Sequence, residues 1–171
     1  MKGRFVRTSQ PLRQGFTIVE AAISVVIVAV MLTAVLQTVG QSSAMQFRVA
    51  ERTRGHQLAR RLMNEIMQQG YVDPAAPASM GPDAGESRPT YNDVDDYNSL
   101  DESPPVNKDL SSLSVPLGST WRRTVSVVWI RPGSLATASP QIETGLKRIT
   151  VTVYHNGVVV TTLSAIRSNA P

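Results

Sequence analysis

The chain of 171 residues contains no cysteine, and only 5% of it is aromatic. Without cysteine a disulfide framework and a thiolate metal site are both excluded. The two histidines, His56 and His155, are far apart and lack the spacing of metal ligands. The sequence also has no serine, histidine and aspartate order, glycine-rich phosphate loop or nucleophile elbow that would indicate catalysis. We therefore expect a protein that is not an enzyme.

After its first 15 residues the chain carries no formal net charge. The formal net charge is +4, but four of the 17 basic residues precede position 16, where no acid occurs. The remaining 13 basic residues balance 13 acidic ones, so most of the chain is neutral. This distribution argues against a nucleic-acid contact. A basic start followed by an apolar run is instead typical of membrane targeting.

The apolar run covers residues 16–36, where the polar side chains are Thr17, Glu20, Ser24 and Thr33. About 20 helical residues span the hydrocarbon core of a bilayer, so a transmembrane helix in contact with lipid is predicted. The alternative is a buried core helix of a soluble protein. The basic flank without acids disfavours that alternative.

Residues 37–70 predict a continuation of the helix with one face that packs on other structure. Residues on this face recur at steps of three and four. They are Val49, Arg52, His56, Ala59, Met63 and Ile66, and Leu58, Leu62 and Met67 widen the face toward the C-terminal end of the helix. The charged residues expected to point outward are Arg48, Glu51, Arg54, Arg60 and Glu65.

The rest of the chain predicts loops and then a sheet. Residues 71–118 are rich in proline and aspartate and indicate an irregular surface region. Residues 119–171 contain three segments with strand composition, and Asn156-Gly157 between the last two favours a tight hairpin. The predicted fold class is α+β: a long N-terminal helix packed on an antiparallel sheet of three to four strands. Residues 37–118 and the sheet would form one globular domain.

The most informative motif is the string from Gln14 to Glu20, in which glycine is followed by phenylalanine, apolar residues and one glutamate. Gly15 has no Cβ, so its peptide bond can enter a tight protease site. Cleavage there removes the basic leader, residues 1–15, and leaves the apolar helix attached. Within the membrane, a lone Glu20 carboxylate costs about 2.5–3.5 kcal/mol and needs a partner. The new amine of Phe16 is one candidate.

This string resembles the cleavage and methylation site of type IV pilins and type II secretion pseudopilins. The resemblance implies cleavage by prepilin peptidase between Gly15 and Phe16, and N-methylation of Phe16. It also assigns Thr17 and Glu20 to assembly, with Glu20 pairing to the amine of a neighbouring subunit. The implied partners are other pilin or pseudopilin subunits in a helical filament and an inner-membrane assembly platform. The implied location is the bacterial inner membrane, with a cytoplasmic N-terminus and an external C-terminal domain, and then the filament.

Two later segments are similar to minor pilins of MSHA-pilus biogenesis. They are the helix end 58–67 and the loop 91–100, which reads YNDVDDYNSL. The closing segment 147–153 also resembles that group and the minor pseudopilins. The resemblance implies a minor subunit, while a type IV pilus, a secretion pseudopilus and a DNA-uptake system all stay open. An uncleaved, single-pass membrane-anchored protein is the alternative function.

The acidic loop around Asp93, Asp95 and Asp96 offers oxygen ligands of the kind that calcium binds. Some pseudopilins hold calcium in a comparable loop. The loop lacks the glycine and distal glutamate of an EF-hand. A solvated loop in which these side chains cap local turns is the alternative. Calcium is the only cofactor that the sequence suggests.

Overall fold

The structure is a computed structural model that describes residues 15–73, 80–113, 118–138 and 142–169. One long helix, α1 (Ile18–Met67), is followed by a four-stranded antiparallel sheet. The strands are β1 (Asp101–Glu102), β2 (Trp121–Trp129), β3 (Leu146–His155) and β4 (Val158–Ser168), and they lie side by side in that order. This is the predicted α+β arrangement.

The chain divides into two compact units, residues 1–46 and residues 47–171, and α1 contributes to both. In the first unit the described side chains are exposed, including the valines and isoleucines of the apolar run. Among the described residues, α1 is the one helix long and apolar enough to cross a membrane.

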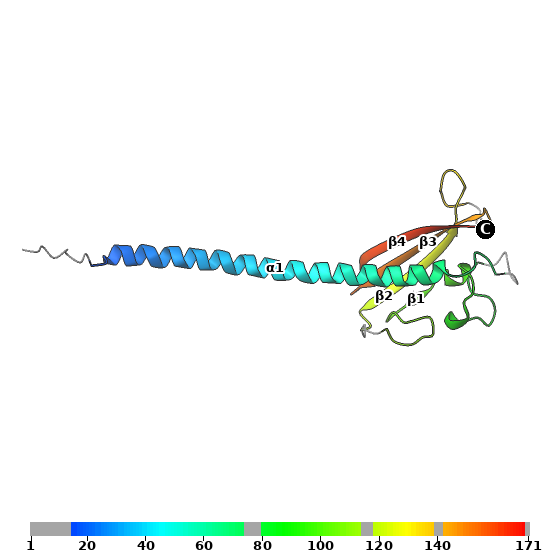
Figure 1. The fold of residues 1–171 in the computed structure, drawn as a ribbon, viewed down its shortest axis with the longest axis horizontal. Coiled ribbons are helices and arrows are strands. Elements are labelled where there is room, and N and C mark those ends of the chain that lie inside the picture. The colour runs from blue at the N-terminus through cyan, green and yellow to red at the C-terminus, as the bar shows by residue number, and fades with distance from the viewer. Residues whose placement is uncertain (1–14, 74–79, 114–117, 139–141, 170–171) are drawn as a thin grey trace, which may run out of the picture. The chain divides into compact units, whose positions relative to one another are not determined.

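The second unit has its core between the C-terminal part of α1 and one face of the sheet (Figure 1). Both partners supply aliphatic side chains that are almost fully buried, which is what an α/β layer requires. The helix contributes Leu58, Ala59, Leu62, Met63 and Ile66, and the sheet contributes Trp121, Val125, Val127, Ile149, Val151 and Val153.

Buried and partly exposed side chains alternate along β3 as the sequence predicts. Ile149, Val151 and Val153 are fully buried, while the residues between them lie on the opposite, partly exposed face. Asn156 and Gly157 both have positive φ, 51° and 77°, as the tight hairpin between β3 and β4 needs. The predicted turn is therefore confirmed.

The predicted packing face of α1 is confirmed in its C-terminal part, where Leu58 and Leu62 are also buried, and is wrong in its N-terminal part. Ala59, Met63 and Ile66 are buried as expected, but Val49, Arg52 and His56 are exposed. The buried face is instead continued towards the N-terminus by Gly55, since the sheet contacts the helix there along a different line. Two glutamates predicted to point outward, Glu51 and Glu65, also turn partly inward, because each has a polar partner: His155 for Glu51, and Arg88 and Tyr97 for Glu65.

Gly55 allows α1 and β4 to approach closely, so its replacement should weaken the fold. A Cβ at this position would lie 2.7 Å from Cγ1 of Val160, a branched side chain with little freedom to move. Gly55→Ala gains about 1 kcal/mol of helix propensity, but the crowding costs about 1–3 kcal/mol. We expect a net loss of stability, measured as a lower Tm of the detergent-solubilised chain.

Gly40 offers the matched control for this substitution. It lies in the same helix, and a Cβ there would meet nothing within 4 Å. Gly40→Ala should therefore leave the Tm unchanged or raise it. Equal effects of the two substitutions would show that the contact with Val160 is unimportant.

Candidate functional site

The N-terminal motif forms the start of α1. Gly15, Phe16 and Thr17 precede the helix and are exposed. The Thr17 hydroxyl accepts a hydrogen bond from the backbone N–H of Glu20, at 3.2 Å, which is the contact of a helix N-cap. Threonine followed three residues later by glutamate is also the pattern of a capping box. The structure thus gives Thr17 a local role that the sequence analysis missed.

Glu20 lies in the first turn of α1, where the partial positive charge of the helix N-terminus favours a carboxylate. Its backbone carbonyl accepts a hydrogen bond from the Ser24 hydroxyl at 2.8 Å. Within the described part of the chain its carboxylate has no side-chain partner. The predicted role of Glu20 in pairing between subunits stays a prediction, as do cleavage after Gly15 and methylation of Phe16. Leader residues 1–14 lie outside the described residues.

The acidic loop is folded tightly onto the second unit. Asp93, Asp95 and Asp96 are each at most 3% exposed. Asp93 Oδ1 accepts the backbone N–H groups of Asp95 and Asp96 at 2.7 and 3.0 Å, and Asp96 Oδ2 accepts that of Asn92 at 2.9 Å. Burial raises the pKa of Asp93, although these N–H groups oppose the shift. Two of the three carboxylates therefore cap turns.

This arrangement does not fit a calcium site. Calcium takes about six to eight oxygen ligands that converge on one point. Asp95 points to Lys147, whereas Asp93 and Asp96 are directed at backbone N–H groups. Within the described ranges, no three histidine, aspartate or glutamate side chains are arranged to hold a metal ion.

A buried ionic cluster, Glu65, Arg88, Glu102 and Arg123, joins α1, the loops and the sheet. Arg88 donates to both carboxylate oxygens of Glu65 at 3.0 and 3.1 Å, and it also pairs with Glu102. Arg123 donates to Glu102 at 2.6 Å. Burial, together with the charge of Arg88, lowers the pKa of Arg123 to about 10. Because the two cations and two anions balance, the cluster can be buried without net charge.

A second buried pair lies at the other end of the sheet. Lys147 on β3 is fully buried, and its Nζ donates to Asp95 Oδ2 at 2.7 Å and to the Tyr71 carbonyl at 2.5 Å. Burial raises the pKa of Asp95 to about 6, although Lys147 opposes this shift. The sequence does indicate that a cation is buried in each of these two places. Lys147 and Arg123 alternate in phase with the apolar residues of their strands, so both lie on the buried face of the sheet.

Comparison with known families bears on the N-terminal segment. Residues 11–36 match the family model described as the prokaryotic N-terminal methylation motif. This match supports membership of the type IV pilin and pseudopilin family. No curated protein and no solved structure matches the chain.

The matched range includes the whole pilin-type motif from Gly15 to Glu20 and ends where the apolar run ends. A pilin-like chain with an apolar N-terminal helix fits a single-pass anchor in the inner membrane. Pilin-like proteins are in general structural rather than enzymatic. The match does not extend to the MSHA subtype, so that resemblance stays a prediction.

Proposed function

We propose that this chain is a filament subunit, cleaved after Gly15 by prepilin peptidase, N-methylated at Phe16 and assembled into a pilus or pseudopilus. The observation that carries this proposal is the methylation motif at residues 11–36, in phase with the start of α1. A minor, priming role follows from the MSHA resemblance. Before assembly the subunit spans the inner membrane with the leader in the cytoplasm, where the basic flank would hold it. Other subunits and the assembly platform are then its partners.

The geometry of the N-terminus supports processing at this position. Gly15 and Phe16 lie outside the helix and are exposed, so a protease can take the peptide bond in an extended form. Cleavage leaves Thr17 and the capped first turn in place, since Thr17 follows the cut. The apolar helix then remains as both anchor and assembly surface. An uncleaved membrane-anchored protein is the rival function, and it needs no free amine at Phe16.

The mass of the mature chain tests the proposal. We expect intact-mass and N-terminal sequence analysis of the membrane-extracted chain to give a protein that begins at Phe16 and carries one added methyl group. The Gly15→Leu variant should keep its full leader, because a branched side chain blocks entry to the protease site. A wild-type chain that retains residues 1–15, or a Gly15→Leu chain that begins at Phe16, would contradict processing at this motif.

A further inference from the structure

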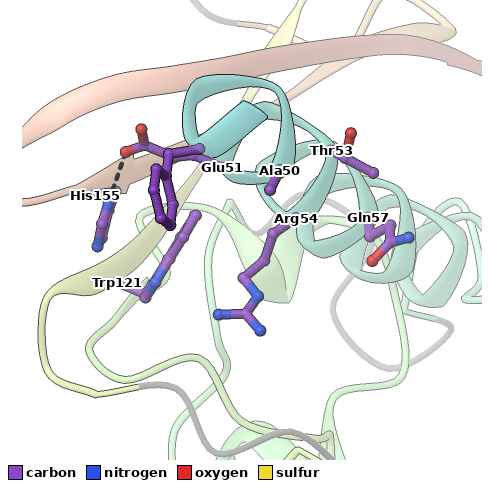
Figure 2. Close-up of a pocket in the computed structure, with 8 residues that line it drawn as sticks. Ala50, Glu51, Thr53, Arg54, Gln57, Trp121 and His155 are labelled. Carbon is purple, nitrogen blue, oxygen red and sulfur yellow. Dashed lines mark hydrogen bonds and ion pairs between the residues drawn. The ribbon is translucent and has the colours of Figure 1, made fainter. Parts of the chain in front are cut away.

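A pocket of about 610 Å³ lies at the end of the sheet where β2 begins and β3 ends (Figure 2). One wall is the α1 segment from Phe47 to Gln57, and the other is formed by Trp121 and His155. The His155 ring stacks on Trp121 with centroids 4.3 Å apart, and its Nδ1 lies 2.5 Å from Glu51. Among the described residues that line the pocket, the one acid, Glu51, is therefore already engaged by another side chain of the pocket.

The described lining of the pocket includes the cation of Arg54 and one exposed aromatic ring, that of Phe47. Figure 2 shows the Arg54 side chain extending from α1 beside Trp121. Among the residues that the structure describes, the Arg54 guanidinium has no hydrogen-bond or ion-pair partner. Phe47, at the start of the pocket, is 77% exposed. A carboxylate would pair with the Arg54 guanidinium, and an apolar side chain would pack on the Phe47 ring. An occupant that carries both would therefore fit this pocket.

The chain presents that combination elsewhere on the second unit, in the turn from Asn107 to Ser111. Asp109 is exposed, and hydrogen bonds from Ser111 lower its pKa, so its carboxylate stays ionised. The next residue, Leu110, is 58% exposed and has a φ of 63°. Such a backbone conformation is unfavourable for leucine, and strain of this kind is retained most often where a side chain is needed for function.

We infer that the Asp109-Leu110 turn of one subunit docks in the Arg54 pocket of a second copy of this chain. The Asp109 carboxylate pairs with the Arg54 guanidinium, and the Leu110 side chain packs against Phe47 at the pocket edge. The charge distribution of the chain favours such a contact between copies. Nine of the 13 acidic residues lie between positions 73 and 109, while residues 47–61 carry five arginines and one acid.

The positions of the two surfaces along α1 determine how copies would be arranged. The turn is tied to the later part of the helix, through Arg61 to Asn107 and Lys108 to Gln69. The pocket lies about 13 residues earlier, which corresponds to ~20 Å along a helix. If the two copies have parallel helices, as in the proposed filament, the contact shifts one copy by this length along the helix axis. Because the turn and the pocket are different surfaces of the subunit, the contact is heterologous and extends into an open filament unless it closes into a ring. The inference therefore rests on the proposed function.

Cysteine cross-linking of the full-length chain in its native cells tests this contact, because the chain has no cysteine of its own. Gln57→Cys places a thiol in the pocket, and Ser112→Cys places one beside the turn, both at exposed positions. A minor subunit has few copies in each filament, so with a short bis-maleimide the chain carrying both cysteines should give a short ladder that begins with the dimer. Each single-cysteine chain should stay monomeric, since a heterologous contact never brings two identical positions together.

Charge reversal within the double-cysteine chain then tests the pairing itself. Arg54→Glu should lower the cross-linked fraction about tenfold, and adding Asp109→Arg should restore it, as a loss of ~1.4 kcal/mol would require. Arg60→Glu, an exposed arginine outside the pocket, should have no effect. Leu110→Gly should also reduce the ladder without lowering the Tm, because glycine accepts positive φ.

Three results would overturn the inference. They are a processed chain in the filament fraction that gives no ladder, a ladder that survives Arg54→Glu, and dimers from either single-cysteine chain. The mass of the mature chain separates this failure from that of the proposed function. If the chain keeps residues 1–15 and gives no ladder, both the proposed function and this contact between copies are wrong.

Discussion

Glu20→Ala is expected to enter the membrane, be cleaved and fold normally, yet to fail in filament assembly. The carboxylate lies in an apolar segment and, within the described residues, has no side-chain partner in the subunit itself. In a filament, packed helices exclude water, so a charge pair with a neighbour's Phe16 amine would be strong. A subunit docked out of register would instead leave the carboxylate unpaired, which is costly.

The expected loss is large, at least about tenfold in the amount of subunit recovered in filaments, or ~1.4 kcal/mol. The measurement is co-purification of the variant with the other subunits, normalised to its level in the membrane fraction. Recovery of Glu20→Ala in filaments at the wild-type ratio would remove Glu20 from assembly and favour the membrane-anchor alternative.

Substitutions of Thr17 test whether the assembly role that the resemblance gives this residue depends on the helix cap. The cap uses the backbone N–H of Glu20, which alanine at position 20 retains. Thr17→Ala removes the cap, at a cost of about 1 kcal/mol to the helix start, but keeps the glutamate. Thr17→Ser retains both hydroxyl and cap. If capping were the role of this motif, Thr17→Ala would impair assembly as strongly as Glu20→Ala does.

Much of the fold was predictable because its determinants are local. The 21-residue apolar run requires a helix in a membrane, and alternation along β3 with Asn156-Gly157 specifies a hairpin and its buried face. The predicted end of α1, at residue 70, differs from the observed end at Met67 by only a few residues. By contrast, β1 has two residues and depends on pairing with β2, so no periodicity could reveal it.

The buried charges were not predicted, because their partners are distant in sequence. Glu65 pairs with Arg88 across 23 residues, and Lys147 pairs with Asp95 across 52. A charged residue in phase with an apolar strand face signals that a partner must exist, but it does not identify the partner. The same limit applies to the acidic loop. Its aspartates have the composition of a cation site, and only the fold shows that backbone N–H groups and Lys147 engage them.

Lys147→Met should destabilise the second unit strongly. It removes the cation that faces Asp95 and leaves that carboxylate buried without its ion-pair partner, an event that costs about 3–5 kcal/mol. The Tyr71 ring, whose centroid lies 4.1 Å from Nζ, also loses a cation contact. The measurement is chemical denaturation of the detergent-solubilised chain. Adding Asp95→Asn should recover more than half of the loss, since no unpaired charge then remains.

The pH dependence of this loss distinguishes an unpaired charge from a packing defect. The folded-state pKa of Asp95, about 6, is above its ordinary value of 3.8, so the folded protein holds a proton that the unfolded chain has released. The stability that protonated Asp95 contributes is therefore fully present below about pH 4 and disappears as the pH rises through 6. Without Lys147 the pKa of Asp95 rises further, because Lys147 is what lowers it. Lys147→Met should consequently cost much more stability near pH 8, where Asp95 must ionise unpaired, than near pH 5, where it stays neutral. A loss of equal size at both values would mean that the shape of the lysine stem, and not its charge, supports this part of the core.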